Sequence, residues 1–389
     1  MFRQFNRINP AVSLARAYST AKVWVVTDGG LESSLRALTL GRQLANGSRL
    51  ELKTIVASKT LQFLPPILQK YMVDWNKTSK DRLPWYLSSP DPLDLAREDR
   101  PDYIVASGQD AVPACLYLSR LNPHKGFSIY LGYPNIPFIH FDQVILPKYE
   151  ANAKMAALGP LARQRNGIIL PAPLLDTAPS SLTSTGVPFT DYSTVVVGGH
   201  SPHCRWYSED AVHLAENIKR MIHHLDDRVV IVYTDRTPQL VKDKMAHVLS
   251  KETESVFMWD STHAVSAMHK LNIYEGILHA SKRVILTADL DYASAHAASR
   301  NKPIYTVFGG QCRSYLNHFH RWLLDSRLAR KLRLDRTRST KHQDPYSYLG
   351  THPAWGNPAQ VFQIKQTMAF VKKEIEALQQ EKMTGKRRS

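Results

Sequence analysis

Short apolar runs alternate along the chain with segments in which apolar residues recur every three or four positions. In the first half, candidate strands lie at residues 23–26, 52–56, 103–106, 127–131 and 143–146. In the second half they lie at residues 194–197, 229–233, 255–259, 284–286 and near Val307. Helical patterns follow at residues 35–44, 113–121 and from Ser208 onward. Short buried strands that alternate with helices predict parallel sheets in an α/β fold.

Residues 283–308 form the clearest unit of this kind. Their sequence, RVILTADLDYASAHAASRNKPIYTVF, contains an apolar strand, a polar turn, an Ala-rich helix and a second strand. Thr287 and Asp289 are predicted to cap the helix, and Asn-Lys-Pro at 301–303 is predicted to end it. Ligands bind at such turns because backbone N–H groups and the helix dipole point outward there.

A stretch rich in Pro, Ser and Thr, residues 171–188, divides the chain into two α/β halves, and 389 residues suffice for two cores. We therefore predict two Rossmann-like lobes with a cleft between them, at 21–170 and 191–345, joined by a linker at 171–190. An amphipathic helix is predicted at 356–382, followed by a basic tail at 383–389. Its apolar residues are Val361, Ile364, Met368, Phe370, Val371, Ile375 and Leu378.

Residues 71–99 have no clear period and are rich in Pro, Trp and charged residues. A loop, or an excursion that faces the other lobe, is therefore predicted for this segment. We expect Trp75, Trp85 and Tyr86 to be packing residues rather than a platform for stacked ligands.

The first 18 residues have the composition of a mitochondrial transit peptide. They contain Arg3, Arg7 and Arg16 but no acidic residue, and their apolar residues match one helical face. The sequence Arg-Ala-Tyr-Ser at 16–19 resembles a matrix processing pattern, so cleavage is predicted near Tyr18. The alternative is a disordered basic tail, because Pro10 interrupts the helix. The predicted location is mitochondrial, in the matrix.

The chain is strongly basic, with a formal net charge of +16. The excess is concentrated at residues 313–342, and anionic partners are therefore plausible. The candidate partners are RNA or the ribosome, an anionic lipid surface, or a mitochondrial protein. Matrix-targeted proteins are commonly basic, and this alternative stays open. No apolar run approaches the roughly 20 residues of a membrane span. The predicted patch for an anionic partner comprises Arg321, Arg327, Arg330, Lys331, Arg333, Arg336 and Arg338.

The three cysteines, Cys115, Cys204 and Cys312, lie far apart in the sequence and form no CxxC pair. Neither a disulfide framework nor a zinc ribbon is indicated. His200, His203 and Cys204 lack a fourth ligand at a recognisable spacing, so no metal is expected.

Several turns after predicted strands carry groups that suit an anion. Gly198 and Gly199 permit close backbone approach, and Ser201, His203 and Arg205 follow them. A Gly-Gly pair also meets the geometric needs of any tight βα turn, so both interpretations stay open.

Other candidates for anion binding follow the next strands. The guanidinium of Arg236 could clamp a phosphate or carboxylate, although Asp235 could neutralise it instead. Asn272 is predicted to cap a helix, and Tyr274 either covers a base or packs in the core.

These pieces together resemble one protein family. WVVTDG at 24–29, PDYIVASG at 101–108, FDQVILP at 141–147 and LG at 158–159 carry the resemblance in the first half. In the second half it is carried by GGHSPH at 198–203, RTP at 236–238, Asn272 with Tyr274, TAD at 287–289, KPIY at 302–305 and FHR at 319–321. The chain is similar to the elongated-mitochondria (ELM) mitochondrial fission family, whose fold resembles the two-lobed GT-B glycosyltransferases. The resemblance implies a GT-B-like fold over about residues 23–330.

The chain departs from the family pattern at the turns themselves. Glu32, Ser34, Leu35 and Arg36 replace the expected polar helix start after Asp28-Gly29. Leu290, Tyr292 and His296 stand where serines and a Glu are expected after TAD, which makes a poorer diphosphate site.

The resemblance and these departures predict a degenerate, non-catalytic binding protein in organelle morphology, fission or matrix gene expression. The alternative is a nucleotide-sugar-dependent transferase that holds a nucleoside diphosphate or nucleotide sugar. Its ligand would lie at Gly29, Gly198, Gly199, Ser201, Arg236, Asn272, Tyr274, Thr287 and Asp289. Asp28 and His203 are the candidate catalytic bases for that alternative, and no cofactor is otherwise expected.

Overall fold

A computed structural model describes residues 21–76, 82–90, 93, 95, 100–155, 166–171, 173–175, 185–201, 204–300, 302–307, 311–312, 314–332 and 358–385. The transit peptide predicted at 1–18 and half of the linker predicted at 171–190 lie outside these residues. The predicted boundaries of the lobes therefore stay a prediction.

The first lobe is built on a parallel sheet of six strands in the order β2-β1-β5-β6-β7-β8. These strands are β1 (Val23–Thr27), β2 (Leu50–Thr54), β5 (Tyr103–Ser107), β6 (Phe127–Leu131), β7 (Gln143–Pro147) and β8 (Gly167–Leu170). Strands β1, β5, β6 and β7 are buried along their whole length, as expected where helices cover both faces of a sheet. The helices are α1 (Leu31–Ala45), α2 (Lys59–Gln62), α3 (Pro66–Trp75), α4 (Val112–Leu121) and α5 (Lys148–Met155), and a small hairpin pairs β3 (Val56–Ala57) with β4 (Leu87–Ser88).

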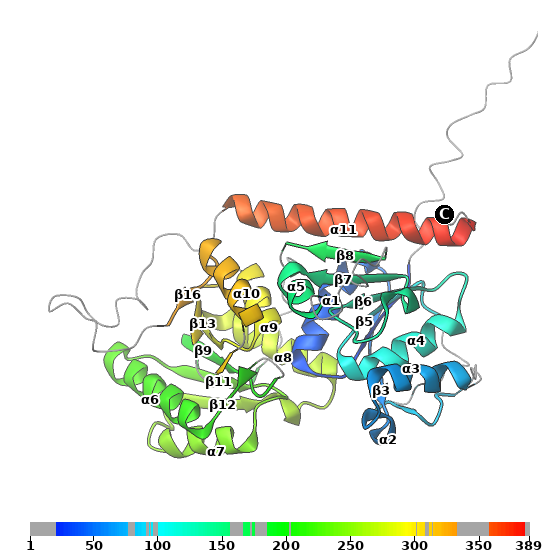
Figure 1. Cartoon of the computed structure of the whole chain (residues 1–389). Helices are drawn as coiled ribbons and strands as arrows, with labels where there is room; N and C mark the ends of the chain where they lie inside the picture. The colour runs from blue at the N-terminus through cyan, green and yellow to red at the C-terminus, as the bar shows by residue number, and fades with distance from the viewer. Residues whose placement is uncertain are drawn as a thin grey trace, which may run out of the picture.

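The second lobe repeats this plan with the strand order β12-β11-β9-β13-β14-β16, again all parallel. Its strands are β9 (Tyr192–Val197), β11 (Val229–Tyr233), β12 (Val256–Asp260), β13 (Ser281–Thr287), β14 (Ile304–Val307) and β16 (Arg330–Lys331). Its helices are α6 (Ser208–Leu225), α7 (Gln239–Val248), α8 (Ala267–Ala280), α9 (Asp291–Ser299) and α10 (Ser314–Asp325). The two Rossmann-like lobes expected from the sequence are confirmed (Figure 1).

A separate two-stranded ribbon lies in the second lobe. It pairs β10 (Cys204–Arg205) with β15 (Gln311–Cys312) in antiparallel fashion. The register sets Cys204 opposite Cys312, so two cysteines that are distant in the sequence occupy facing positions of the backbone.

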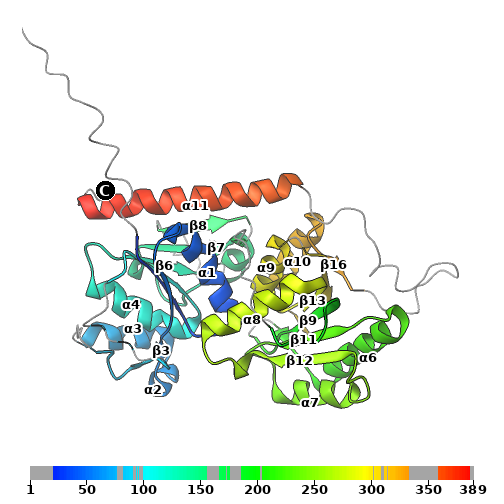
Figure 2. The same ribbon diagram turned by 180° about the vertical axis from the view of Figure 1, so that it is seen from behind.

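One hydrophobic core extends through both lobes. Helices α1, α8 and α9 lie between the two sheets (Figures 1 and 2), and α1 contacts both of the others. The cluster includes Val25 and Leu38 of the first lobe together with Tyr274 and Ala293 of the second. At the rim of this interface, Arg42 of α1 forms an ion pair with Glu275 of α8 at 2.9 Å. The lobes therefore share a core rather than merely a surface contact.

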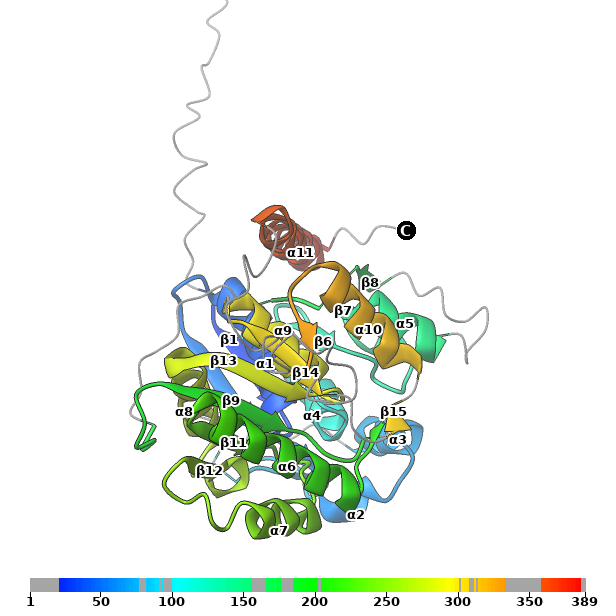
Figure 3. The same cartoon turned by 90° about the vertical axis from the view of Figure 1, so that its left-hand side faces the viewer.

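The final helix, α11 (Pro358–Thr384), lies along one side of the molecule and extends over both lobes (Figures 1 and 3). Met368, Val371 and Ile375 are buried in the shared core, whereas Phe370 is exposed. Near its end, Lys382 donates hydrogen bonds to the Gly126 carbonyl and to Asp142, at 2.7 and 2.8 Å. The C-terminal end of α11 is therefore bound to the first lobe.

The predicted loop at 71–99 is wrong at its start, because α3 continues to Trp75. The expectation that its aromatic residues pack inside holds only for Tyr86, which is fully buried against Tyr117 of α4. Trp75 and Trp85 are exposed. An apolar residue pattern cannot tell which apolar side of a helix meets the protein, and here α3 has apolar residues on both sides.

Candidate functional site at the cleft between the lobes

The carboxyl ends of the central strands of both sheets face a common cleft with a volume of about 740 Å³. From the first lobe, the turns after β1 and β5 contribute residues 28–30 and 107–110. From the second lobe, the turns after β9, β11 and β13 contribute Ser201, residues 234–236 and Asp289. In each sheet this is where the strand order reverses direction, which is the usual ligand position in open α/β sheets.

The turn after β9 is held by the turn after β13. The Gly198 N–H donates to the Thr287 hydroxyl, and the Gly199 N–H donates to Oδ2 of Asp289, both at 2.9 Å. The indole N–H of Trp206 and the Thr287 hydroxyl donate to the other oxygen of Asp289. The prediction that Thr287 and Asp289 cap helix α9 is wrong, since the cap position is Leu290 and no side chain caps it. Their polar groups instead bind the neighbouring turn.

The first lobe places a carboxylate at the start of a helix of the second lobe. Glu32, in the first turn of α1, accepts a hydrogen bond from the Ala293 N–H of α9 at 3.1 Å. Its other oxygen binds the Arg236 guanidinium at 2.9 Å, and Arg236 also contacts Asp289 at 3.1 Å. Backbone N–H groups in the first turn of a helix attract anions. The Glu32 carboxylate therefore occupies an anion-binding position in the first turn of α9.

The second lobe makes the reciprocal contact, from one of its carboxylates to a helix of the first lobe. Asp235, in the turn after β11, accepts a hydrogen bond from the Leu31 N–H at the start of α1 at 2.7 Å. Lys270 of α8 contacts Asp235 and donates to the Gly29 carbonyl at 2.7 Å. Of the two alternatives for Asp235, the contacts favour a role across the cleft: Asp235 binds α1 and Lys270, whereas Arg236 pairs with Glu32 and Asp289. Each lobe supplies a carboxylate to the first turn of the other lobe's helix.

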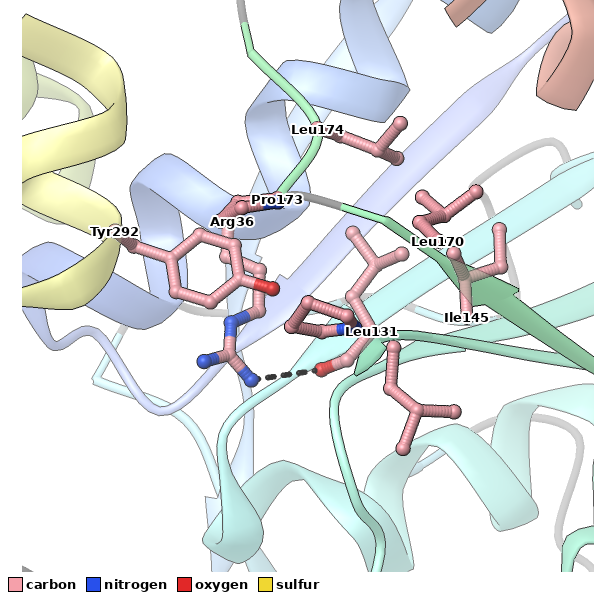
Figure 4. Close-up of a pocket in the computed structure, with 9 residues that line it drawn as sticks. Arg36, Leu131, Ile145, Leu170, Pro173, Leu174 and Tyr292 are labelled. Atoms are coloured by element: carbon pink, nitrogen blue, oxygen red, sulfur yellow. Dashed lines mark hydrogen bonds between the residues drawn. The ribbon is translucent and has the colours of Figure 1, made fainter. Parts of the chain in front are cut away.

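Arg36 forms a second junction between the lobes beside the cleft (Figure 4). Its guanidinium lies 3.6 Å from the centre of the Tyr292 ring and donates to the Leu131 carbonyl at 3.3 Å. The carboxylates of Glu150 and Asp291 lie at 3.8 and 4.0 Å. Arg36 and Tyr292, two of the departures noted in the sequence, thus form a cation–π pair between the lobes.

Burial raises the pKa of Glu32 from 4.5 to about 7. Arg236 opposes this effect, Asp291 and Asp289 add to it, and the Ala293 N–H lowers the pKa. A carboxyl group whose pKa is higher in the folded than in the unfolded chain binds more protons when folded. It contributes stability below its unfolded pKa, and this contribution is lost as the pH rises through 7.

We therefore expect wild-type protein to lose stability between pH 5 and pH 8, relative to the variant Glu32→Gln. The shift to about 7 sets an upper limit of about 3 kcal/mol for this difference. Urea unfolding of both proteins across the range measures it, and the comparison cancels the titration of buried histidines such as His320. Identical pH profiles for the two proteins would show that Glu32 ionises normally.

Among the residues that the structure describes, acidic groups outnumber basic ones around the cleft. Seven described carboxyl groups line it: Asp28, Glu32, Asp110, Glu150, Asp235, Asp289 and Asp291. The cationic groups in the same lining are Arg36, Arg236 and Lys270, and each has a carboxylate partner within 4 Å. The cleft is therefore acidic although the whole chain carries +16. Such a field disfavours a polyanionic ligand.

Two of these carboxyl groups form a separate pair on the first lobe. Asp28 accepts hydrogen bonds from the Gly30 N–H at 3.0 Å and from the Ser33 hydroxyl. Burial and the nearby Asp28 raise the pKa of Asp110. Gly108 has φ +96 and lies against Asp28, so a side chain would not fit between these turns.

Most residues predicted to bind a ligand lie at or beside this cleft. Gly29, Ser201, Arg236 and Asp289 line it, together with the candidate base Asp28. Gly199 and Thr287 donate hydrogen bonds to Asp289, and Gly198 donates to Thr287. The other candidate base, His203, lies outside the described residues. Ligand binding by these residues stays a prediction.

Two predicted site residues are placed elsewhere. Asn272 lies within α8, whose cap is Ser266, so its predicted capping role is wrong. Tyr274 is fully buried and packs on His296 in the core, which leaves no face for a ligand.

The basic patch is described only in part. Arg321, Arg327 and Lys331 are exposed and Arg330 is half-buried, whereas Arg333, Arg336 and Arg338 lie outside the described residues. An anionic partner for this patch therefore stays a prediction.

The sequence did not reveal the groups that join the lobes. Glu32 stood out only as a replacement in a family motif, and Lys270 and Asp291 carried no signal. Their partners lie in the other lobe or in a different turn, and no local pattern records such contacts.

Neither a metal-binding cluster nor a membrane-spanning helix is found among the described residues. No group of three or more His, Cys, Asp or Glu side chains there is arranged to hold a metal ion. None of the helices described has the length and apolar character of a membrane span.

Comparison with known proteins gives a family match and distant likenesses of fold. The family model for mitochondrial fission ELM1 matches residues 33–349. None of the curated proteins matches the chain significantly. The UDP-GlcNAc 2-epimerase of Methanocaldococcus jannaschii, with UDP-GlcNAc and UDP, is 10% identical over 90% of this chain and 99% of its own, with a TM-score of 0.44. The ADP-heptose LPS heptosyltransferase II of E. coli is 15% identical over 92% and 99%, with a TM-score of 0.41. Likenesses this distant indicate no substrate.

Proposed function

The chain belongs to the mitochondrial fission ELM1 family, and on this premise we propose that it is a binding protein without catalytic activity. We propose that it acts in the shape or division of mitochondria, or in gene expression in their matrix. The family name supports the link to mitochondria.

One observation carries the proposal that catalysis has been lost: the chain's own Glu32 binds the first turn of α9 and Arg236. A nucleoside diphosphate at this turn would have to displace that carboxylate. It would also bring its negative charges next to Asp289 and Asp291. Both effects weaken binding, because a buried carboxylate would lose its partners and like charges would approach each other.

Nucleotide titration tests this proposal directly. A ligand present at 100 times its Kd would stabilise the fold by about 2.7 kcal/mol, which a melting experiment detects readily. We expect no change in Tm with about 1 mM UDP, ADP or their sugar conjugates, which excludes any Kd near 10 μM. A clear rise in Tm with one of these nucleotides would contradict the proposal and favour a transferase.

A matched variant shows why the wild type would not bind the nucleotide. Glu32→Ala removes the carboxylate from α9 and leaves Arg236 in place. If the variant binds a nucleoside diphosphate that the wild type does not, the chain's own carboxylate blocks the site. If neither binds, the acidic residues around the cleft suffice to exclude the ligand.

A nucleotide-sugar-dependent transferase is the second candidate, and one observation favours it. Asp28 and Asp110 lie together in the cleft, and burial with the neighbouring charge raises the pKa of Asp110. Paired carboxyl groups with separated pKa values suit acid and base roles. Release of free nucleoside diphosphate from a nucleotide sugar, abolished by Asp28→Asn, would establish this activity.

A matrix location is proposed from the predicted transit peptide, and it fits poorly with a fission role at the outer surface of the organelle. Protease treatment of intact mitochondria, and of mitochondria with a ruptured outer membrane, distinguishes the two. Degradation in intact mitochondria would exclude the matrix.

A further inference from the structure

Helix α3 and the turn before it expose a row of large apolar side chains. Phe63, Ile67, Tyr71 and Trp75 recur at intervals of four residues, and Leu68 lies beside them. Phe63 is 89% exposed and Trp75 is 80% exposed. We call these five residues the α3 patch. Contiguous apolar surface of this kind on a folded protein marks a site of interaction.

The α3 patch rests on a rigid support. Arg120 of α4 donates to the Val73 carbonyl at 2.7 Å and pairs with Asp74, which Lys70 also contacts, at 2.6 Å. Val73 is buried on the opposite side of the helix. The helix cannot turn its apolar row inward, because its inner face is already filled.

The position of the patch keeps it clear of the cleft and of the last helix. In Figures 1 and 2, α2 and α3 lie at an edge of the first lobe, away from α11. The inference therefore does not depend on whether the cleft binds a ligand.

The chemistry of this edge fits a lipid bilayer with anionic headgroups. Phe, Tyr and Trp are the residues that settle at the boundary between headgroups and acyl chains. Lys59 of α2 and Lys70 of α3 lie on the elements that carry the patch, and Asp74, which pairs with Lys70 and with Arg120 of α4, is the one acidic residue described on α2, α3 and α4. The patch lies on one helix and the turn before it, and exposed aromatic side chains so placed can enter a bilayer without needing a matching pocket.

We propose that the α3 patch binds the surface of an anionic phospholipid bilayer, with the aromatic side chains inserted among the lipids. The bound protein would be peripheral, held by apolar insertion and by attraction of the basic residues to headgroup phosphates. Neither contribution alone gives stable attachment.

Flotation of the full chain with vesicles tests the proposal. We expect binding to vesicles made of equal parts phosphatidylcholine and phosphatidylglycerol, and weaker binding to phosphatidylcholine alone. Leu68→Glu should lower the partition coefficient about tenfold, because it removes apolar contact and adds a repelled charge. The matched control is Leu240→Glu on α7, since Leu240 is 57% exposed and Leu68 is 45% exposed. This control should bind as the wild type does.

A second readout reports the patch alone, independently of the basic N-terminus. Phospholipids brominated on their acyl chains should quench part of the tryptophan fluorescence, and Trp75→Phe should remove much of that quenching while binding persists. Equal flotation of the Leu68→Glu variant and the wild type, or unchanged quenching in Trp75→Phe, would overturn the proposal. Self-association in sedimentation without lipid, abolished by Leu68→Glu, would overturn it too and assign the patch to a dimer.

Discussion

Replacing Arg236 by alanine is expected to lower the free energy of unfolding by about 2 to 4 kcal/mol. Arg236 is the cation that lies between Glu32, at 2.9 Å, and Asp289, at 3.1 Å. Without it, two carboxylates face each other in a buried site, and the Asp289 side chain has no access to solvent. Urea unfolding at pH 8 measures the loss. The loss should be smaller at pH 5, because burial raises the pKa of Glu32 to about 7 and the protonated group no longer repels Asp289.

Two further variants show whether the loss comes from the junction between the lobes. Arg220→Ala, at an exposed position on α6, should change stability by no more than about 0.5 kcal/mol. The double variant Arg236→Ala with Glu32→Gln should recover about 1 to 2 kcal/mol of the loss, because the carboxylate that repels Asp289 is gone. Additive losses in the double variant would mean that Glu32 and Arg236 do not interact.

Gly199→Ala is expected to be equally damaging, with a loss of about 3 kcal/mol or more. A Cβ atom on Gly199 would lie 1.8 Å from the carbonyl oxygen of Arg236 and 2.9 Å from the Thr237 nitrogen. Both are backbone atoms, so relief requires the turns after β9 and β11 to move apart. That movement also strains the hydrogen bond from the Gly199 N–H to Asp289.

Gly47→Ala is the control for loss of glycine itself. Gly47 has φ +84, and a Cβ atom there meets nothing within 4 Å. Its substitution should cost only about 1 kcal/mol, from backbone strain. Thermal or urea unfolding compares the two variants. A loss at Gly199 no greater than that at Gly47 would mean that the two turns separate easily.

The strands and the two-lobed plan could be predicted because parallel strands covered on both faces are continuous apolar runs. The runs at 194–197, 229–233 and 284–286 all became buried strands, and the glycines or polar residues that followed them marked the ends of β9, β11 and β13. The position of the cleft followed from the same pattern.

The chemistry of the cleft could not be predicted in the same way. Glu32 and Arg236 are 204 positions apart, and so are Leu31 and Asp235. From the sequence alone, Arg236 was predicted to bind a ligand. A local motif shows which groups lie at a turn, but it does not show which groups contact that turn from the other lobe. Asp289 was likewise expected to serve its own helix, yet it binds the turn after β9. In each case the charged or polar group is paired with a residue that lies far away in the sequence.

The shared core also determines when the first lobe can complete its folding as the chain emerges. Val371 and Ile375 of α11 are fully buried in the core that begins with β1, and Lys382 binds backbone and side chain of the first lobe. A chain that emerges N-terminus first, from a ribosome or through a membrane channel, cannot finish its first lobe until its last helix has arrived. The first strands of the chain therefore stay partly exposed until nearly all of the chain has emerged.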